Sequence, residues 1–386
     1  MRVLIDYRPA LRERSGAGEY THQLVRALTM EYAANGSHGL EISLFSSSWK
    51  DRLVNVSELG PVSVIDRRVP VRVLNLAWHR LEWPPAELLT GRRYDVTHSS
   101  HPLMLPARHA ARVITIHDLN FLEHPERTRA EVRRDYPALA RRHAHRADRI
   151  LVSSNFTARE VECRFGVPKE RIALCPPGAP DWPVRATSPA DGYVLFVGTL
   201  EPRKNIGGLL DAYELLLDRS QSAIRNPHSG MARVPELVLA GRATDEARRW
   251  LDRIGRTPLA GMVRRVGYFD PSRRSELYGG ARLLVLPSFE EGFGLPVLEA
   301  MTIGVPVVAA RRGALPEVLG DAGLLVDPDR PEEIADAIAR LLGDRTFASE
   351  CAARGVARAR TFRWDVTART VYDAYQEAIE HHAHRR

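Results

Sequence analysis

Short apolar runs alternate with amphipathic stretches along most of this 386-residue sequence. Runs at 2–6, 41–45, 112–116, 193–197 and 281–286 end at glycine, proline or polar residues, which is typical of buried parallel strands. The stretches between such runs place apolar residues at helical spacing. This alternation predicts an α/β fold built from doubly wound parallel sheets. Two weaker segments, 62–65 and 71–73, are expected to be short strands or connectors.

The chain length predicts two domains of this kind. Residues 176–192 contain five prolines and two glycines with almost no periodicity, which indicates a domain boundary. We therefore expect a first domain at 1–180, a linker at 181–192 and a second domain at 193–363. The apolar-periodic segment at 364–386 is long enough to cross back to the first domain.

The stretch 287–312, PSFEEGFGLPVLEAMTIGVPVVAARR, carries the strongest chemical signal. It follows the buried strand 281–286 and begins with a turn that contains Glu291. A helix expected to start at Pro296 contains Glu299. Open parallel sheets bind ligands beyond the carboxyl ends of their strands, so we expect both glutamates to face one crevice.

Three further strand ends carry candidate residues. Arg203 and Lys204 precede a helical pattern, and cations beside free helix N–H groups suit a diphosphate. Gly16 and Gly18 lie in a turn that would expose backbone N–H groups to a phosphate, although Gly-x-Gly alone also fits a plain tight turn. His117 ends the strand 112–116, where its ring is placed to bind a sugar hydroxyl or phosphate, or to be structural only.

The net charge of +7 lies entirely in the first half of the chain. Residues 1–186 hold 28 basic and 21 acidic residues, and the remaining 200 residues hold 27 of each. A basic half is compatible with nucleic acid, an anionic membrane, an anionic substrate or solvated arginine-rich faces. Residues 127–149 hold eight arginines and three acidic residues. This composition fits either a solvated helix face or an interfacial segment that docks on anionic lipid.

Several classes of protein and site are not expected. No apolar run approaches the roughly 20 residues of a spanning helix, and charges interrupt the N-terminal apolar run, which argues against a signal peptide. The three cysteines are far apart and suggest a reducing compartment. His143-x-His145 does not have the i,i+4 spacing of metal ligands on a helix, so we expect no metal. We expect a cytoplasmic protein, or a peripheral one at the inner face of the cytoplasmic membrane through 127–149, and no nucleic-acid partner.

The sequence resembles the retaining, nucleotide-sugar-dependent glycosyltransferases of family 4. The resemblance rests on Glu291 and Glu299, with seven residues between them in EEGFGLPVLEAMTIGVPVV, and on VLFVGTLEPRKN at 194–205. ITIHDLNFLEHPE at 114–126 and GALPEVLGDAGLLVDP at 313–328 are also similar to segments of that family. The resemblance implies the GT-B fold, in which two Rossmann-like domains face a cleft.

The resemblance also implies roles for individual residues. Glu291 would contact the hydroxyls of the donor sugar, and Lys204 with Arg203 would neutralise the leaving diphosphate. His117 would lie on the acceptor side, near the donor sugar. The donor-binding set that the resemblance implies is Gly16, Gly18, Thr199, Gly292, Phe293, Gly294, Leu295 and Glu299, with Glu299 on the donor ribose. Thr199 stands where many members of the family have arginine.

The segment GTLEPRKN is similar to the corresponding segment in one branch of this family. That branch resembles the GDP-mannose-dependent mannosyltransferases of surface-polysaccharide synthesis. The expected activity is therefore transfer of a hexose, foremost mannose from GDP-mannose, to a glycan, lipid-linked or small-molecule acceptor. No cofactor beyond the GDP- or UDP-linked substrate is implied. The alternatives are a UDP-sugar-dependent glycosyltransferase, a GT-B nucleotide-sugar epimerase, and a non-enzymatic module that binds a nucleotide sugar or nucleic acid.

Overall fold

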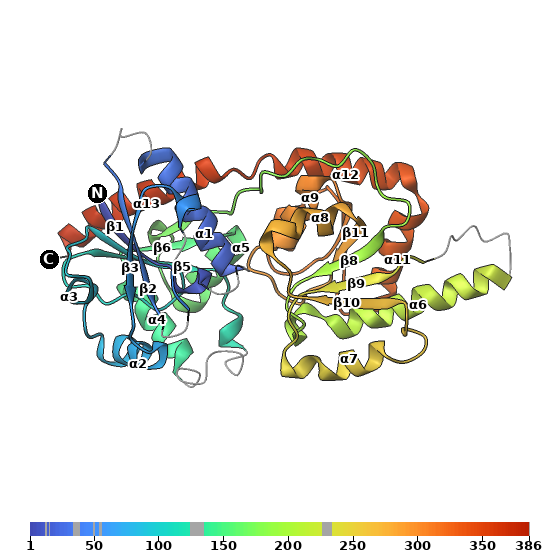
Figure 1. Ribbon diagram of the computed structural model, residues 1–386, viewed down its shortest axis with the longest axis horizontal. Helices are drawn as coiled ribbons and strands as arrows, with labels where there is room; N and C mark the ends of the chain where they lie inside the picture. Colours follow the sequence, from blue (N-terminus) through green and yellow to red (C-terminus); the bar gives the residue numbers. More distant parts are fainter. Residues whose placement is uncertain are drawn as a thin grey trace. The chain divides into compact units, whose positions relative to one another are not determined.

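The computed structural model describes residues 1–11, 14, 16–33, 39–48, 51–53, 56–123, 135–225 and 234–385. It divides into two compact units. Unit 1 comprises Met1–Gly178 and Arg363–Arg386, and unit 2 comprises Ala179–Phe362. Each unit contains one parallel sheet with helices packed against it (Figure 1). No helix within the described residues is long and apolar enough to cross a membrane.

The sheet of unit 1 has seven strands in the order β3-β2-β1-β4-β5-β6-β7. Every neighbouring pair is parallel. The order reverses between β1 and β4, which makes this the topological switch point of the sheet. The strands are β1 (Arg2–Asp6), β2 (Glu41–Ser47), β3 (Val62–Arg67), β4 (Val96–Ser99), β5 (Ala111–Ile116), β6 (Arg149–Val152) and β7 (Ile172–Leu174).

Alternate side chains of each strand in unit 1 enter different cores. Val3 and Ile5 pack in a cluster with side chains of α1 (Ala17–Leu28) and α13 (Trp364–His384). Leu4 points to the other face and packs against Trp78. That face is covered by α2 (Val71–Leu76), the π-helical turn η4 (Ala77–Leu81), α3 (Ala86–Thr90) and α4 (Tyr136–Arg146); α5 (Asn155–Glu160) follows β6.

Unit 2 has six parallel strands in the order β10-β9-β8-β11-β12-β13, with its switch point between β8 and β11. The strands are β8 (Tyr193–Val197), β9 (Leu237–Ala240), β10 (Val263–Gly267), β11 (Ala281–Leu286), β12 (Val307–Ala310) and β13 (Leu324–Val326). The helices are α6 (Ile206–Arg225), α7 (Arg248–Ile254), α8 (Arg274–Gly279), α9 (Leu295–Ile303), α10 (Leu315–Leu319), α11 (Pro331–Gly343) and α12 (Arg345–Ala359).

The doubly wound parallel sheets predicted from the sequence are confirmed in both units. The prediction of a strand or connector at 71–73 is wrong, because these residues begin α2. Leu74 and Trp78 are buried four residues apart, which is helical spacing and brings both side chains to one face. The sequence analysis also named no helix where α12 lies.

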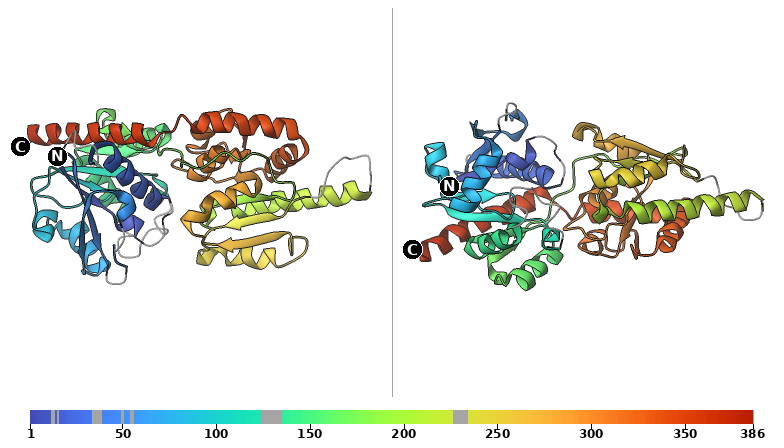
Figure 2. Two further views of the ribbon diagram at one scale, coloured as in Figure 1. Left: turned by 45° about the horizontal axis from the view of Figure 1, so that its top comes forward. Right: turned by 90° about the horizontal axis from the view of Figure 1, so that it is seen from below.

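The last helix and the proline-rich segment pack on different units (Figure 2). α13 belongs to unit 1, where Tyr375 is fully buried and its hydroxyl lies 2.7 Å from Nδ1 of His98. Residues 181–192, expected as a linker, belong to unit 2. There the backbone N–H of Arg185 donates to the carbonyl of Ile303 over 3.0 Å.

Candidate active site

The turns that follow β8 and β11 are joined at the switch point of unit 2. The turn after β8 forms the 3-10 helix η9 (Pro202–Lys204). The backbone N–H of Phe289, in the turn after β11, donates to the carbonyl of Arg203 over 2.9 Å. Because β8 and β11 are hydrogen-bonded neighbours, the carboxyl ends of two strands far apart in sequence present their turns together.

Glu291 is the centre of a buried ionic cluster in these turns. Lys204 donates from Nζ to Oε1 of Glu291, and Oγ of Ser288 donates to the same oxygen over 2.7 Å. Arg203 reaches Oε2 over 3.3 Å and the carbonyl of Glu290 over 2.8 Å. Glu291 and Lys204 are only 6% and 7% exposed, so this is a desolvated pair. Three of the four residues predicted as catalytic are thus in direct contact.

The charges of this cluster are set by mutual attraction against burial. Burial raises the pKa of Glu291, but the positive charges of Lys204 and Arg203 outweigh it and lower the pKa to about 2. Burial lowers the pKa of Lys204, while Glu291 opposes this shift. Glu291 is therefore an ionised acceptor at neutral pH.

Gly313 allows a second loop to support Glu291 from the unit 2 core. The backbone N–H of Ala314 donates to the carbonyl of Glu291 over 2.9 Å. Gly313 has φ of 60°, and a Cβ there would lie 2.5 Å from the same carbonyl oxygen. A side chain at position 313 would therefore push the Glu291 turn out of place.

Glu299, which lies on α9, contacts a different set of side chains from Glu291. The hydroxyl of Tyr278 donates to Oε2 over 2.6 Å, and Arg274 donates to Oε1 over 2.7 Å. Both partners lie on α8, four residues apart, and Glu299 is 6% exposed. Burial and the Glu299 charge raise the pKa of Tyr278 well above its ordinary value, so its hydroxyl stays a donor. The sequence analysis did not name Arg274 or Tyr278; their four-residue spacing was the available signal.

The turn predicted to bind the donor leads directly into α9. Gly292, Phe293 and Gly294 are buried. Gly294 caps the helix with φ of 102°, a conformation that favours glycine. α9 begins at Leu295, one residue before the expected start, with Pro296 in its first turn.

The turn after β8 differs from the prediction in one respect. Thr199 is half-buried there, close to Arg203 and Lys204 in the chain. The sequence analysis expected free N–H groups at the start of the following helix. Instead, Oδ1 of Asn205 accepts from the N–H of Gly208 over 3.1 Å, so one of these donors of α6 is already capped.

The candidate residues of unit 1 also meet at the carboxyl edge of their sheet. Gly16 is the N-cap of α1 with φ of 51°, and a Cβ at Gly18 would lie 2.6 Å from the carbonyl oxygen of Pro9. The ring of Tyr20, in the first turn of α1, packs edge-on against the ring of His117, with 5.1 Å between the two ring centroids. The structure therefore brings the glycine turn and His117 together, as their strand-end positions suggested.

His117 is a neutral side chain in this setting. Burial lowers its pKa to about 4, although Asp118 opposes the shift. Its Nε2 is buried without a hydrogen-bond partner among the described residues. At neutral pH the ring can thus donate or accept one hydrogen bond but adds no positive charge.

The described residues contain no group of three or more His, Cys, Asp or Glu side chains that could hold a metal ion. The acidic residues of the unit 2 site contact arginine, lysine, serine and tyrosine side chains instead. This donor set suits hydroxyl and phosphate recognition.

Comparisons with known proteins identify the family. Two family profiles match: "Glycosyltransferase Family 4" over residues 14–181 and "Glycosyl transferases group 1" over residues 184–358. The O-antigen chain mannosyltransferase B of Escherichia coli is 32% identical over 97% of this chain and 100% of its own length. The chain is a family 4 glycosyltransferase.

This glycosyltransferase is also similar to proteins that are named for other activities. The D-inositol 3-phosphate glycosyltransferase of Acidothermus cellulolyticus is 29% identical over 96% of this chain and 87% of its own length. Among solved structures, sucrose-phosphate synthase from Thermosynechococcus elongatus has a TM-score of 0.72 at 22% identity, over 97% of this chain and 98% of its own. Anabaena HepE, in complex with UDP and glucose, has a TM-score of 0.68 at 18% identity, with the same coverage. The glycosyltransferase has the GT-B fold of two Rossmann-like domains.

Proposed function

We propose that this glycosyltransferase transfers a hexose from a nucleoside diphosphate sugar with retention at the anomeric carbon. The foremost donor is GDP-mannose, and the acceptor is a glycan, a lipid-linked glycan or a small molecule of surface-polysaccharide or glycoconjugate synthesis. The observation that carries the proposal is the buried cluster of Lys204, Arg203 and Glu291 at the switch point of unit 2. Open α/β sheets bind nucleotides at this position.

The ion pair is suited to open when the donor binds. A diphosphate carries the charge that Lys204 and Arg203 need, so it can replace Glu291 as their partner. Glu291, released from Lys204, then accepts hydrogen bonds from vicinal hydroxyls of the sugar. Because Glu291 balances the charge of Lys204 and Glu201 balances that of Arg203, no isolated buried charge has to be maintained before the donor arrives.

The proposed reaction breaks the bond between the anomeric carbon and the diphosphate oxygen. The acceptor oxygen bonds to the same face of that carbon, and its proton passes to the departing phosphate. Lys204 and Arg203 stabilise the negative charge that develops on the diphosphate. Glu299, with Tyr278 and Arg274, forms the proposed nucleoside side of the site. No metal enters these steps, so turnover is expected to persist in EDTA.

His117 has a narrower role in this proposal. Its lowered pKa keeps the ring neutral at pH 7, so it would position a hydroxyl by a hydrogen bond and would not neutralise the diphosphate. The proposed contacts of Gly16 and Gly18 are through backbone N–H groups.

Mannose is favoured by the GTLEPRKN segment and by the similarity to the O-antigen chain mannosyltransferase B of E. coli. UDP-sugars are the second candidate, because the structure of Anabaena HepE is of a complex with UDP and glucose. An epimerase would release UDP from UDP-N-acetylglucosamine without any acceptor, which separates it from both transferase hypotheses.

The test is a thermal-shift panel of GDP-, UDP- and ADP-sugars on the full chain, with Lys204→Ala as the matched variant. GDP-mannose should raise the melting temperature most, and the variant should lose the increase. Stabilisation by UDP-sugars alone would make the mannose assignment wrong. Proton NMR of the product with the accepted donor then reports the anomeric configuration, and an inverted product would contradict retention.

A further inference from the structure

Unit 1 contains a cavity at the amino edge of its sheet that the proposed reaction does not use. Its volume is about 160 Å³, room for several water-sized groups. Trp78 and Trp83 line one part, and Arg108, Arg112 and Arg146 line another. Arg112 lies near the amino end of β5, whereas His117 follows its carboxyl end. At about 3.3 Å per residue, roughly 16 Å of strand separates Arg112 from His117.

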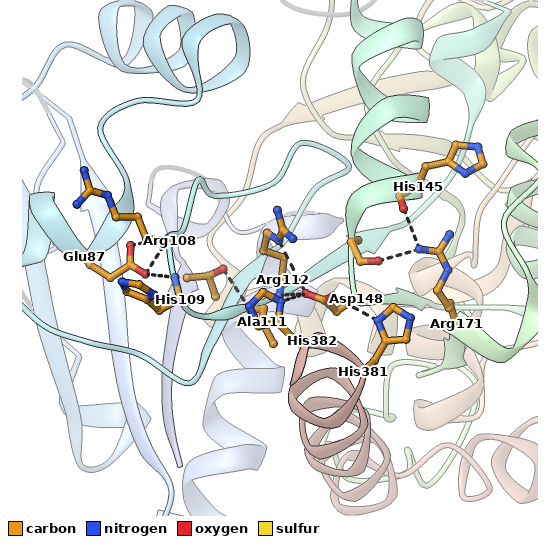
Figure 3. Close-up of polar contacts among 12 residues, drawn as sticks. Glu87, Arg108, His109, Ala111, Arg112, His145, Asp148, Arg171, His381 and His382 are labelled. Carbon is orange, nitrogen blue, oxygen red and sulfur yellow. Dashed lines mark hydrogen bonds and ion pairs between the residues drawn. The ribbon is translucent and has the colours of Figure 1, made fainter. Parts of the chain in front are cut away.

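The cavity wall has more positive than negative groups. Three guanidinium groups line it, against the single carboxylate of Glu82, which is paired with Arg146. Arg112 is within 3.8 Å of Asp148, but its Nε has no hydrogen-bond partner among the described residues. Asp148 is shared, since it also accepts from the backbone N–H of Arg112 and lies 3.1 Å from His382 (Figure 3).

His143 adds an unused donor to the same wall. It is 1% exposed, and its Nδ1 accepts from the N–H of Met104 over 2.9 Å, so the proton of the neutral ring is on Nε2. Nε2 has no partner among the described residues. A buried donor without an acceptor is unusual in proteins and points to a ligand that carries acceptor oxygens.

The segment that contributes Trp78, Glu82, Trp83 and Pro85 to the cavity wall is apolar and basic. Among the described residues of unit 1, five of the nine exposed large apolar side chains lie within 73–88: Val73, Leu76, Leu81, Trp83 and Leu88. Leu81 and Trp83 flank Glu82 of the cavity wall and are 72% and 58% exposed. Residues 67–93 also contain six arginines and only two acidic residues, Glu82 and Glu87.

α3, which carries Leu88, is fastened to the cavity wall. Glu87 of α3 accepts hydrogen bonds from the backbone N–H groups of Arg108 and His109 over 3.0 and 3.1 Å, as Figure 3 shows. An exposed apolar rim beside a cationic cavity matches the two parts of an anionic lipid, its acyl region and its phosphate.

We propose that this cavity binds the phosphate of an anionic phospholipid headgroup while Leu81, Trp83 and Leu88 enter the lipid interface. The membrane segment suggested by the sequence, 127–149, is a poorer candidate. Residues 127–134 lie outside the described residues. The exposed side chains of α4 are Ala138, Arg141, Arg142 and His145, and its Leu139 is buried in the core.

The proposal is tested by sedimentation of the full chain with vesicles, without any measurement of transfer. Binding is expected to phosphatidylcholine vesicles that contain phosphatidylglycerol and to be much weaker with phosphatidylcholine alone. Arg92 is an exposed arginine of segment 67–93 that does not line the cavity, and Arg92→Gln should weaken binding about fivefold. Arg108→Gln and Arg112→Gln should weaken it more, because they also remove a cavity contact.

Matched substitutions on the opposite face of the sheet separate this surface from a general charge effect. Leu81→Ser and Trp83→Ser should reduce binding at least fivefold, whereas Met30→Ser and Arg26→Gln on η2 (Thr29–Ala33) and α1 should not. Phosphatidylglycerol with brominated acyl chains should quench tryptophan emission in the wild type and much less in Trp83→Phe. Arg108 is exposed, so its variant keeps the test valid if Arg112→Gln fails to fold.

The proposal is wrong if the protein does not bind vesicles, or if it binds neutral and anionic vesicles equally. It is also wrong if Arg92→Gln weakens vesicle binding as much as Arg108→Gln and Arg112→Gln do. A fourth contrary result is that Met30→Ser and Arg26→Gln weaken vesicle binding as much as Leu81→Ser and Trp83→Ser do. Glycerol 3-phosphate distinguishes a soluble ligand from a lipid. If it stabilises the chain against heat in an Arg112-dependent way while vesicles do not bind, the cavity takes a soluble phosphate and the lipid assignment is wrong.

Discussion

At the residue scale, one lysine has an unusual position. The chain contains 52 arginines and three lysines, and Lys204 is buried against Glu291. A compact ammonium group fits a single carboxylate oxygen and can move to a phosphate oxygen on its flexible stem. Arg203 stays anchored by the carbonyl of Glu290 and by Glu201, 3.0 Å away. Lys204 can therefore change its partner more easily than Arg203, and the two cationic groups also differ in shape.

Replacement of either member of the ion pair should reduce turnover strongly. We expect Lys204→Ala and Glu291→Ala each to lower kcat/KM at least 10-fold, because each removes a charge or acceptor that acts on the donor. Lys204→Ala also removes one of the two cations that contact Glu291 and should lower the free energy of unfolding by about 1–3 kcal/mol.

Steady-state kinetics and urea unfolding measure these two effects. Lys169→Ala, at an exposed lysine in unit 1, serves as the control and should change neither. Near-normal turnover in both site variants would remove the assignment of the active site.

At the element scale, the position of Glu291 depends on the packing of two loops. The turn after β11 is held by the loop after β12 through Ala314 and by the close approach of Gly313. α9 then begins at Gly294, whose positive φ turns the chain into the helix. The glycines of this stretch are therefore explained by geometry before any ligand is considered.

Gly313→Ala should reduce both stability and turnover. The new methyl group would lie 2.5 Å from the carbonyl oxygen of Glu291 and 2.8 Å from its nitrogen, so the catalytic turn must shift. Gly320→Ala is a matched control, since Gly320 has nearly the same φ, 59°, but only a side-chain atom of Arg358 at 3.7 Å.

Both variants bear the backbone strain of a non-glycine residue at positive φ, and Gly320, with ψ of −130°, is in a region that only glycine adopts readily, so both should be less stable than the wild type. Only Gly313→Ala should lose turnover, by about 100-fold for a displacement near 1 Å. Thermal melts and kinetics of the two proteins decide the question. Equal activity would show that the Glu291 turn does not need this support.

At the scale of the whole molecule, the ionisable groups are distributed unevenly between the units. Thirteen of the fourteen histidines lie in unit 1. Burial lowers the pKa of five of those that the structure describes: to about 2 for His79, about 3 for His98, about 4 for His117 and His143, and below its ordinary value for His22. In unit 2, the charges of Lys204 and Arg203 outweigh burial and lower the pKa of the Glu291 carboxylate to about 2.

Acid should therefore destabilise unit 1 at a higher pH than unit 2. A histidine with a lowered folded pKa is protonated first in the unfolded state, so its contribution to stability is lost as the pH falls below about 6.5. At pH 5.5 His79, His98, His117 and His143 together would lower the free energy of unfolding by roughly 5 kcal/mol. Glu291 begins to lose its contribution only below about 4.5, and the loss continues to about pH 2.

Hydrogen exchange with mass spectrometry at pH 7 and pH 5.5, with times scaled for the intrinsic rate, measures each unit separately. Peptides of unit 1 should lose protection at pH 5.5 while those of unit 2 keep it. Glu291→Gln should flatten the response of unit 2 below pH 4.5. Earlier opening of unit 2 would contradict the pKa assignments.

The doubly wound sheets and the strand ends that carry candidate residues were predictable from the sequence. Apolar runs and helical spacing act over a few residues, so they can be read locally, and the spacing of Glu291 and Glu299 is also local. The short α2 was not recognised, because its few residues lack a distinctive period until Leu74 and Trp78 are seen to share a core.

Which side chains neutralise one another depends on the folded arrangement of the strands and helices. Lys204 and Glu291 are 87 residues apart in the chain, and their contact depends on the order of β8 and β11 in the sheet. Arg274 and Tyr278 became part of the site because α8 packs against α9. Burial and charge pairing are sums over segments distant in the chain. For that reason the pKa values and the cavity of unit 1 follow from the fold and cannot be obtained from local pattern.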